Sequence, residues 1–378
     1  MTSKKRTMAI VGTGSIARVH AMACQGLPDV ELVAACDVDV DRARAFAGRW
    51  GMERHMNDVA DLIALRPDSV SICTPHPSHG ELLRQIAGAR IDCMVEKPLT
   101  VNLADARLAL EAAEKAGARV GVIFQRRYWP AAQRLRKAID EGRLGRIVQA
   151  ECVVRYSRTL AYFSPDRSPW RGRWDSEGGG VTVNHASHAL DMLQWFVGPF
   201  DSLYARWDNQ THPGVEVDTM VAGTAKLTNG GLASISFGLN PHQTEKGFFE
   251  VTVYGESGAW ASVREEPEGA FGHNAQWEVP GEQDAMQELT ARELAEDRRM
   301  YRIVDKGRKP PELSPDCYRA QYRDFFDHLD GKPGYGLTGR EGLKTVEIIE
   351  AIYQSCRQDT PVHWPIAAAA EAPRGGAA

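Results

Sequence analysis

The sequence lacks the features that would point to a membrane, secreted or nucleic-acid-binding protein. No segment approaches the ~20 consecutive apolar residues of a membrane-spanning helix. Met1 to Arg6 is polar and basic, without the apolar stretch of a secretion signal. The formal net charge of −5 leaves no basic excess for nucleic acid or an anionic membrane. We therefore expect a cytoplasmic protein with no nucleic-acid and no membrane partner.

Paired cysteines are also missing. The seven cysteines are scattered, and none forms a Cys-x-x-Cys pair. An odd, unclustered set favours small core residues in a reducing compartment over a disulfide framework. His76 and His79 have a spacing that a metal could use, but no cysteine or carboxylate completes a site there. The sequence therefore predicts no metal.

The chain is long enough, at 378 residues, for two domains. In its first third, short apolar runs alternate with amphipathic stretches, which predicts an α/β domain with a parallel, doubly wound sheet. The expected strands are Ala9–Val11, Leu32–Cys36, Val70–Cys73, Cys93–Val95 and Val120–Phe124. The expected helices are Ile16–Gln25, Asp41–Trp50, Val59–Leu65, His79–Ala87 and Leu103–Ala116.

From about Arg146 the sequence is richer in β-strand patterns, with a hairpin signal at Asn229-Gly230-Gly231, and predicts a mostly antiparallel sheet. Its expected strands are Ile147–Arg155, Met220–Leu227, Leu232–Phe237 and Phe249–Tyr254. Its expected helices are Pro130–Glu141, Ala186–Phe196, Tyr318–Leu329 and Gly342–Ser355. We divide the chain into an N-terminal domain (1–125), a C-terminal domain (126–365) and a disordered tail (366–378) rich in alanine and glycine.

The segment from Gly12 to Ala17 reads Gly-Thr-Gly-Ser-Ile-Ala and lies between the first expected strand and helix. In that context the pattern is a dinucleotide-binding fingerprint. Gly12 permits a tight turn, Gly14 lets the backbone approach a pyrophosphate, and the helix N-terminus supplies N–H donors. The expected cofactor contacts here are Gly12, Thr13, Gly14, Ser15 and Ile16.

Asp37 ends the second expected strand, where a carboxylate can accept hydrogen bonds from the adenosine ribose hydroxyls. The same carboxylate would repel the 2′-phosphate of NADP. We therefore predict NAD as the cofactor, with NADP less favoured, although Arg42 and Arg44 are near in sequence. The alternative is that Asp37 only caps a helix.

Thr74, Pro75 and His79 follow the strand that ends at Cys73. The carboxyl ends of such strands face the ligand crevice, so we expect all three residues to contact the cofactor, with His79 on the nicotinamide side. The alternative is that Ser78 caps a helix and His79 is a polar surface residue.

Glu96-Lys97-Pro98 follows the short apolar run Cys93–Val95. A lysine at the end of a buried strand is a candidate catalytic group, because partial burial lowers a lysine pKa. The alternative is a surface Glu-Lys pair in a loop.

A second polar constellation lies in Gly178–Asp191, at the start of an apolar helix. Asn184 and His188 are four residues apart and so share one helical face. The alternative is that His188 is a polar residue with no chemical role.

Taken in order, four motifs resemble the glucose–fructose oxidoreductase / inositol dehydrogenase (Gfo/Idh/MocA) family: Gly12–Ala17, Asp37, Glu96–Pro98 and Gly178–Asp191. Further segments fit the family and extend the resemblance over nearly the whole chain: Gly121–Arg127 with Pro130, Trp170–Gly172 and Ala351–Pro365. The resemblance implies an N-terminal Rossmann domain and a C-terminal α/β domain with an open sheet. It also implies a homodimer or homotetramer and NAD(P)-dependent redox chemistry on sugar-like small molecules.

The resemblance also assigns roles to individual residues. Lys97 matches the catalytic lysine, His188 the acid/base histidine, and Glu96 the residue near the nicotinamide ribose. The bond from Lys97 to Pro98 is often cis in such proteins. Asn184 departs from the pattern, since many members carry aspartate there, and an amide cannot share a proton as a carboxylate can.

The predicted reaction is hydride transfer between nicotinamide and a secondary hydroxyl or keto group of a sugar, cyclitol or glycoside. His188 would act as general base and Lys97 would stabilise the developing alkoxide. Asn184 and Arg127 would hold neighbouring hydroxyls. Trp170 and Arg171 would line the pocket, unless that loop is instead a domain or subunit contact. Two other functions stay open: an NAD-dependent glycosidase that oxidises its substrate transiently, and a non-catalytic dinucleotide sensor, which should have lost the lysine or histidine.

Overall fold

The computed structural model describes residues 5–164, 169–240, 247–265, 272–281, 286, 288–289, 291–292, 315–334 and 336–367. The chain forms two compact units. Unit 1 comprises Met1–Gln125 and Ser314–Val346, and unit 2 comprises Arg126–Leu313 and Glu347–Ala378. The chain therefore returns to unit 1 near its end, whereas the sequence analysis assigned 126–365 to a single domain. The predicted disordered tail lies, from residue 368 on, outside the described residues.

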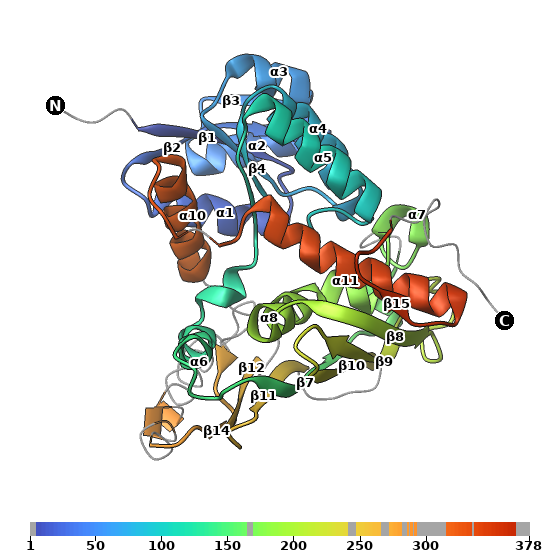
Figure 1. Ribbon diagram of the computed structural model, residues 1–378. Coiled ribbons are helices and arrows are strands. Elements are labelled where there is room, and N and C mark those ends of the chain that lie inside the picture. Colours follow the sequence, from blue (N-terminus) through green and yellow to red (C-terminus); the bar gives the residue numbers. More distant parts are fainter. Residues whose placement is uncertain are drawn as a thin grey trace. The chain divides into compact units, whose positions relative to one another are not determined.

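Unit 1 contains a parallel sheet in the strand order β3-β2-β1-β4-β5-β6 (Figure 1). Its strands are β1 (Arg6–Val11), β2 (Val30–Cys36), β3 (Arg54–Met56), β4 (Ser69–Ile72), β5 (Asp92–Val95) and β6 (Val120–Val122). The intervening helices are α1 (Ser15–Gln25), α2 (Val40–Trp50), α3 (Val59–Leu65), α4 (His79–Gly88) and α5 (Leu103–Ala116). The prediction of a doubly wound sheet is confirmed. Only β3 was missed, because its three residues are polar or partly exposed and form no apolar run.

The strand order of this sheet reverses between the neighbouring strands β1 and β4. From β1 the chain continues to β2 and β3 on one side, and from β4 it continues to β5 and β6 on the other. At such a reversal the loops that follow the strands diverge and leave a crevice at the carboxyl edge of the sheet. The loops after β1, β2, β4 and β5 carry the residues that the sequence analysis selected as cofactor and catalytic contacts.

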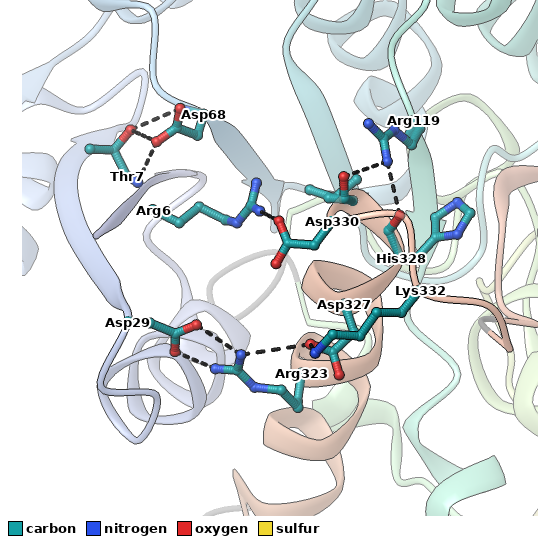
Figure 2. Close-up of polar contacts among 11 residues, drawn as sticks. Arg6, Thr7, Asp29, Asp68, Arg119, Arg323, Asp327, His328, Asp330 and Lys332 are labelled. Carbon is teal, nitrogen blue, oxygen red and sulfur yellow. Dashed lines mark hydrogen bonds and ion pairs between the residues drawn. The ribbon is translucent and has the colours of Figure 1, made fainter. Parts of the chain in front are cut away.

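Helix α10 (Pro315–Leu329) belongs to unit 1 and packs against α1. Figure 2 shows the ionic contacts that fasten it: Arg323 pairs with Asp29, and Arg6 lies 2.5 Å from Asp330. Arg119 donates to the carbonyl oxygens of the last two residues of the helix, at 2.9 and 2.7 Å. These contacts join residues between 209 and 324 positions apart, so the spacing patterns of the sequence hold no trace of them.

Unit 2 is built on a sheet that, within the described residues, has nine strands in the order β13-β12-β11-β7-β10-β9-β8-β15, with β14 beside β12. Its main strands are β7 (Ile147–Ser157), β8 (Phe200–Asp208), β9 (Met220–Leu227), β10 (Leu232–Asn240), β11 (Phe248–Gly255) and β12 (Trp260–Glu265). Three short strands complete it: β13 (Gly272–His273), β14 (Trp277–Glu278) and β15 (Val362–His363). In the described part β10 and β7 run parallel and the other pairs antiparallel, which confirms a mostly antiparallel sheet.

One face of this sheet is covered by a helix. Along β7 every second side chain, from Ala150 to Tyr156, is buried, and α8 (Ser187–Val197) packs against β7 and β11. The remaining helices are α6 (Pro130–Asp140), α7 (Trp174–Glu177) and α11 (Gly339–Gln358), which begins in unit 1 and ends in unit 2. On the opposite face, residues of β7, β10, β9 and β8 line a hollow. No helix in the described part of the chain has the length and apolar character needed to cross a membrane.

Candidate functional site

The loop after β1 contains two glycines with different reasons for being glycine. Gly12 has φ +82°, and a Cβ there would lie 2.8 Å from the backbone of Cys73 and Thr74, so the fold itself requires glycine. Gly14 caps α1 with an ordinary φ of −68°, and a Cβ there would meet no atom of the chain within 4 Å. The fold does not explain Gly14. Close approach of a ligand phosphate to the N-terminus of α1 does, so this loop fits a dinucleotide.

Asp37 lies at the end of β2 and is bound to this loop. Its Oδ2 accepts hydrogen bonds from the backbone N–H and the hydroxyl of Thr13, both at 2.8 Å, and its Oδ1 accepts the N–H of Asp39 at 3.1 Å. Burial alone would raise the pKa of Asp37, but these hydrogen bonds and the Arg42 guanidinium lower it below its usual value. Asp37 is therefore an ionised acceptor suited to ribose hydroxyls.

Arg42 lies beside Asp37 and therefore bears on the choice between NAD and NADP. Its Nη2 lies 3.2 Å from Asp37 Oδ2, so a cation does stand beside the carboxylate that was expected to repel a 2′-phosphate. The Arg42 side chain is 57% exposed, whereas that of Asp37 is 5% exposed. The exposed partner is free to move while the buried one is held, so Asp37 sets the local geometry.

His79 does not lie where the sequence analysis expected it. The ring is fully buried, with Nδ1 2.8 Å from the carbonyl oxygen of Pro98 and Nε2 2.9 Å from that of Thr74. Burial lowers the pKa of His79. Because both ring nitrogens bridge the loops after β4 and β5, His79 braces these loops, and neither a nicotinamide contact nor a polar surface position describes it. Thr74 is half-buried and Pro75 exposed on the same loop.

The loop that carries Lys97 is held by the carboxylate of Glu96. Glu96 is 6% exposed, and its Oε2 accepts the backbone N–H of Lys97 at 3.0 Å. Its Oε1 lies 3.0 Å from Nε2 of His20 and accepts the hydroxyl of Tyr318 at 3.2 Å. The Lys97–Pro98 peptide bond is cis, as the resemblance implied. Glu96 therefore orients the lysine-bearing loop, and Lys97 itself remains half-buried.

His20 is the counter-ion of Glu96. Its other ring nitrogen lies 2.7 Å from the Ser71 hydroxyl and 2.6 Å from that of Tyr322. Burial alone would lower the pKa of His20, but Cys73 and Glu96 raise it to about 10, so the imidazole is protonated at neutral pH. His20, Tyr318 and Tyr322 were not singled out from the sequence. Two tyrosines four residues apart on α10 are the one signal that could have drawn notice.

In unit 2 the last two of the three glycines after α7, Gly179 and Gly180, are explained by packing. Gly179 has φ +151°, and a Cβ there would overlap the Tyr353 hydroxyl. A Cβ at Gly180 would overlap the carbonyl oxygen of Asp218. The buried Asp218 carboxylate accepts the N–H groups of Gly180 and Thr182 at 2.7 and 2.9 Å, and burial raises its pKa. This arrangement fixes the backbone entering a π-helical turn, Val181–His185.

Asn184 lies in that turn, and His188 follows one turn later in α8. The predicted α-helix is therefore preceded by a π-turn. The Asn184 amide nitrogen donates to Glu177 Oε1 at 2.8 Å and to the Tyr162 hydroxyl at 3.3 Å. Glu177 is 1% exposed. Burial raises the pKa of Glu177 to about 7, although the hydrogen bonds from Gly172 and Asn184 and the charge of Arg171 act to lower it. His188 is 6% exposed.

Aromatic and cationic groups surround Tyr162. The guanidinium carbon of Arg171 lies 4.0 Å from the centre of the Tyr162 ring and 4.8 Å from that of Trp170. The guanidinium of Arg158 lies over the rings of Tyr162 and Tyr156, and its Nε donates a hydrogen bond to His185 Nε2 at 3.1 Å. Trp170 and Arg171 thus belong to the same cluster as Asn184, through Tyr162. Tyr162 and Glu177 were not singled out from the sequence.

Arg127 is held by a buried ion pair with Asp191. Its Nε and Nη2 donate to the two oxygens of Asp191 at 2.8 and 2.6 Å, and its guanidinium lies 5.1 Å from the Trp195 ring centre. Arg127 is 5% exposed. A bidentate pair of this kind is a rigid structural element, so the geometry favours a supporting role for Arg127 in place of the expected contact with a substrate hydroxyl. Among the described residues no group of three or more histidine, cysteine, aspartate or glutamate side chains could hold a metal ion.

The two glycines of the first loop give a matched pair of variants. Gly14→Ala should change the free energy of unfolding by no more than about 1 kcal/mol and weaken NAD binding by roughly 5- to 100-fold, since a Cβ would overpack the pyrophosphate site. Gly12→Ala should destabilise the fold, because alanine is strained at φ +82° and meets the backbone of Cys73. Denaturant unfolding and NAD titration measure both. Tight NAD binding by Gly14→Ala would contradict the assignment.

Glu177 predicts a pH-dependent stability. Its pKa rises from the usual 4.5 to about 7 on folding, so the folded chain binds the proton more tightly and stability falls as the pH rises from 4.5 through 7. Glu177→Gln should remove this penalty, so that the variant gains about 3 kcal/mol relative to the wild type between pH 4.5 and pH 8. Glu216→Gln, at an exposed position of the same unit, is the control. Parallel pH curves for wild type and Glu177→Gln would contradict the prediction.

Comparisons with known proteins agree with this arrangement. The family model described as "Oxidoreductase family, NAD-binding Rossmann fold" matches residues 6–124, and "Oxidoreductase family, C-terminal alpha/beta domain" matches residues 136–364. D-glucoside 3-dehydrogenase of Escherichia coli (strain K12) is 28% identical over 387 aligned positions, covering 96% of this chain and 98% of that protein. Inositol 2-dehydrogenase of Rhizobium meliloti (strain 1021) is 33% identical over 189 positions, covering 50% and 54%.

Solved structures give the same result. The WlbA dehydrogenase from Bordetella pertussis, crystallised with NADH and UDP-GlcNAcA, superposes with a TM-score of 0.83 at 26% identity and covers 97% of this chain and 100% of that one. Residues 6–124 are accordingly an NAD-binding Rossmann domain. With both family models matched in sequence order over nearly the whole chain, the protein belongs to the Gfo/Idh/MocA oxidoreductase family.

Proposed function

We propose that this protein transfers a hydride between NAD and a secondary hydroxyl or keto group of a sugar-like molecule, with glycosides the first class to test and cyclitols the second. The observation that carries the proposal is the placement of Gly14, Asp37 and Lys97 on the loops after β1, β2 and β5, at one edge of a single sheet. The substrate class is supported by the resemblance to D-glucoside 3-dehydrogenase, which extends over almost the full length of both chains.

The residues present fit NAD in unit 1. The N-terminus of α1 with Gly12, Thr13, Gly14, Ser15 and Ile16 would bind the pyrophosphate, and Asp37 would accept the adenosine ribose hydroxyls. Thr74, Pro75 and the Lys97 loop would border the nicotinamide half, with Glu96 and His79 bracing that loop. The bound cofactor supplies the hydride acceptor or donor.

The side chains of the protein then manage one proton and the geometry of the substrate. His188 accepts the proton of the reacting hydroxyl, since an imidazole nitrogen can act as a general base. Lys97 donates a hydrogen bond to the developing alkoxide and stabilises its charge. Asn184 holds a neighbouring hydroxyl, and Trp170 with Arg171 offers an aromatic face and guanidinium donors to the sugar.

Two further parts of the proposal concern the protein in the cell. We place it in the cytoplasm. We also propose a homodimer or homotetramer formed through the face of the unit 2 sheet that lies opposite α8. In support of this, Leu232, an apolar residue in the lining of the hollow on that face, is 61% exposed. It is lined by short polar side chains as well, among them Gln149, Thr224 and Ser234.

The preference for NAD over NADP rests on Asp37, and Arg42 makes it testable. Asp37→Ser should weaken NAD binding by about 10-fold through lost hydrogen bonds. It should also strengthen NADP binding, because Arg42 is released to pair with the 2′-phosphate. Asp37→Ser/Arg42→Ala should lose the gain for NADP. Titration of all three proteins with both cofactors decides, and a wild type that prefers NADP would overturn the preference.

The reaction is tested by a screen of sugars, cyclitols and glycosides for NADH formation. On the best substrate, Lys97→Ala should lower kcat by about 10² or more, the cost of removing a positioned charge stabiliser, with little change in NAD affinity. Lys115→Ala, on an exposed position of α5, is the matched control. A Lys97→Ala variant with wild-type turnover would show the assigned role to be wrong. Release of an aglycone without net NADH would instead favour the glycosidase mechanism.

A further inference from the structure

Glu177 has no part in the proposed reaction, yet it is one of the most buried acids of unit 2, with 1% of its surface exposed. It ends α7, directly before the three glycines. Its two oxygens have separate partners: Oε2 accepts the backbone N–H of Gly172 at 2.6 Å, and Oε1 accepts the Asn184 amide nitrogen at 2.8 Å. A buried carboxylate is costly, so a position that keeps one calls for a reason beyond packing.

The contact with Glu177 determines which way the Asn184 amide faces. An ionised carboxylate only accepts hydrogen bonds, so the NH₂ end of the amide must point to Glu177 and its carbonyl oxygen must point to the other side. The Tyr162 hydroxyl, 3.3 Å from the same nitrogen, supports that orientation. The Gly172 N–H fixes Glu177 in turn, because it is a backbone donor that cannot reverse. The amide is therefore locked, whereas an unheld asparagine could present either end.

A locked amide has a specific meaning for the substrate. An asparagine held in this way is an acceptor only, like the aspartate that many relatives are expected to carry at position 184, but without its charge. Its partner must be a donor, and on a sugar-like molecule the available donor is a hydroxyl. Building on the proposed function, we infer that Glu177 is a positioning residue that locks Asn184 as a hydrogen-bond acceptor. The substrate is then a vicinal diol whose second hydroxyl donates to Asn184 Oδ1.

Three variants test the lock at pH 8.5, where Glu177 is ionised. Asn184→Asp places two carboxylates side by side, and Glu177→Gln turns an NH₂ toward the Asn184 NH₂, because Gly172 holds the glutamine carbonyl. Each should lower kcat/KM by about 10- to 100-fold. Glu177→Gln/Asn184→Asp restores one donor facing one acceptor, and should return kcat/KM to within about 5-fold of the wild type. Glu216→Gln/Asn184→Asp, which removes an exposed acid of the same unit, should show no rescue.

The substrate half of the inference has its own readout. For the best glycoside from the screen, the analogue that lacks the hydroxyl next to the oxidised carbon should lose about 10- to 100-fold in kcat/KM with the wild type. It should lose little more with Asn184→Ala, since the partner is already gone. Equal losses for both proteins would overturn the assignment of Asn184 as the acceptor for that hydroxyl.

Thermal unfolding of the same variants separates this inference from the proposed function. The lock predicts that Asn184→Asp lowers Tm at pH 8.5 and that adding Glu177→Gln restores it, with or without substrate. Absence of this recovery would overturn the lock. Recovery of Tm without recovery of kcat/KM would overturn the role toward substrate. A wild type that oxidises no polyol, with an intact pattern in Tm, would overturn the proposed function and leave the lock supported.

Discussion

The loop that carries Lys97 depends on one buried ion pair, that of Glu96 with His20. A carboxylate that is 6% exposed has lost most of its hydration, and a charge in that position is tolerated only when it is paired and hydrogen-bonded. His20, Tyr318 and the N–H of Lys97 meet both needs. Removing one partner of such a pair typically costs about 3–5 kcal/mol. The backbone of Lys97 is thus held in place by its hydrogen bond to Glu96, which is itself held by His20.

Glu177, a buried acid of unit 2, has different surroundings. Glu96 meets a protonated imidazole, which lowers its pKa, whereas Glu177 meets only neutral donors at hydrogen-bond distance, and burial raises its pKa to about 7. The first acid is a permanent anion and serves as an anchor. The second is an anion only on the alkaline side of neutrality, which suits a residue that sets the direction of a neighbouring amide. The same side-chain type thereby performs two physically distinct tasks.

Much of this could be predicted from the sequence, because strand and helix periodicity reports burial directly. The parallel sheet, the glycine loop before α1 and the place of Lys97 after β5 follow from local patterns. The errors concern partners. His79 braces two loops and Arg127 pairs with Asp191, and both look like free polar residues when only neighbours in sequence are read. His20 and Glu96 are 76 residues apart, and a single hydrogen bond across that distance imposes no spacing on the chain between.

The return of the chain to unit 1 has a consequence for its synthesis. A ribosome makes residues 1–125 well before the helix whose Tyr318 and Tyr322 complete the network around Glu96 and His20. Until then unit 1 lacks α10, and the whole of unit 2 up to residue 313 is made in between. The cofactor-binding unit therefore reaches its final form only after residues 126–313 have been made, and until then Glu96, beside Lys97, lacks the hydroxyl of Tyr318.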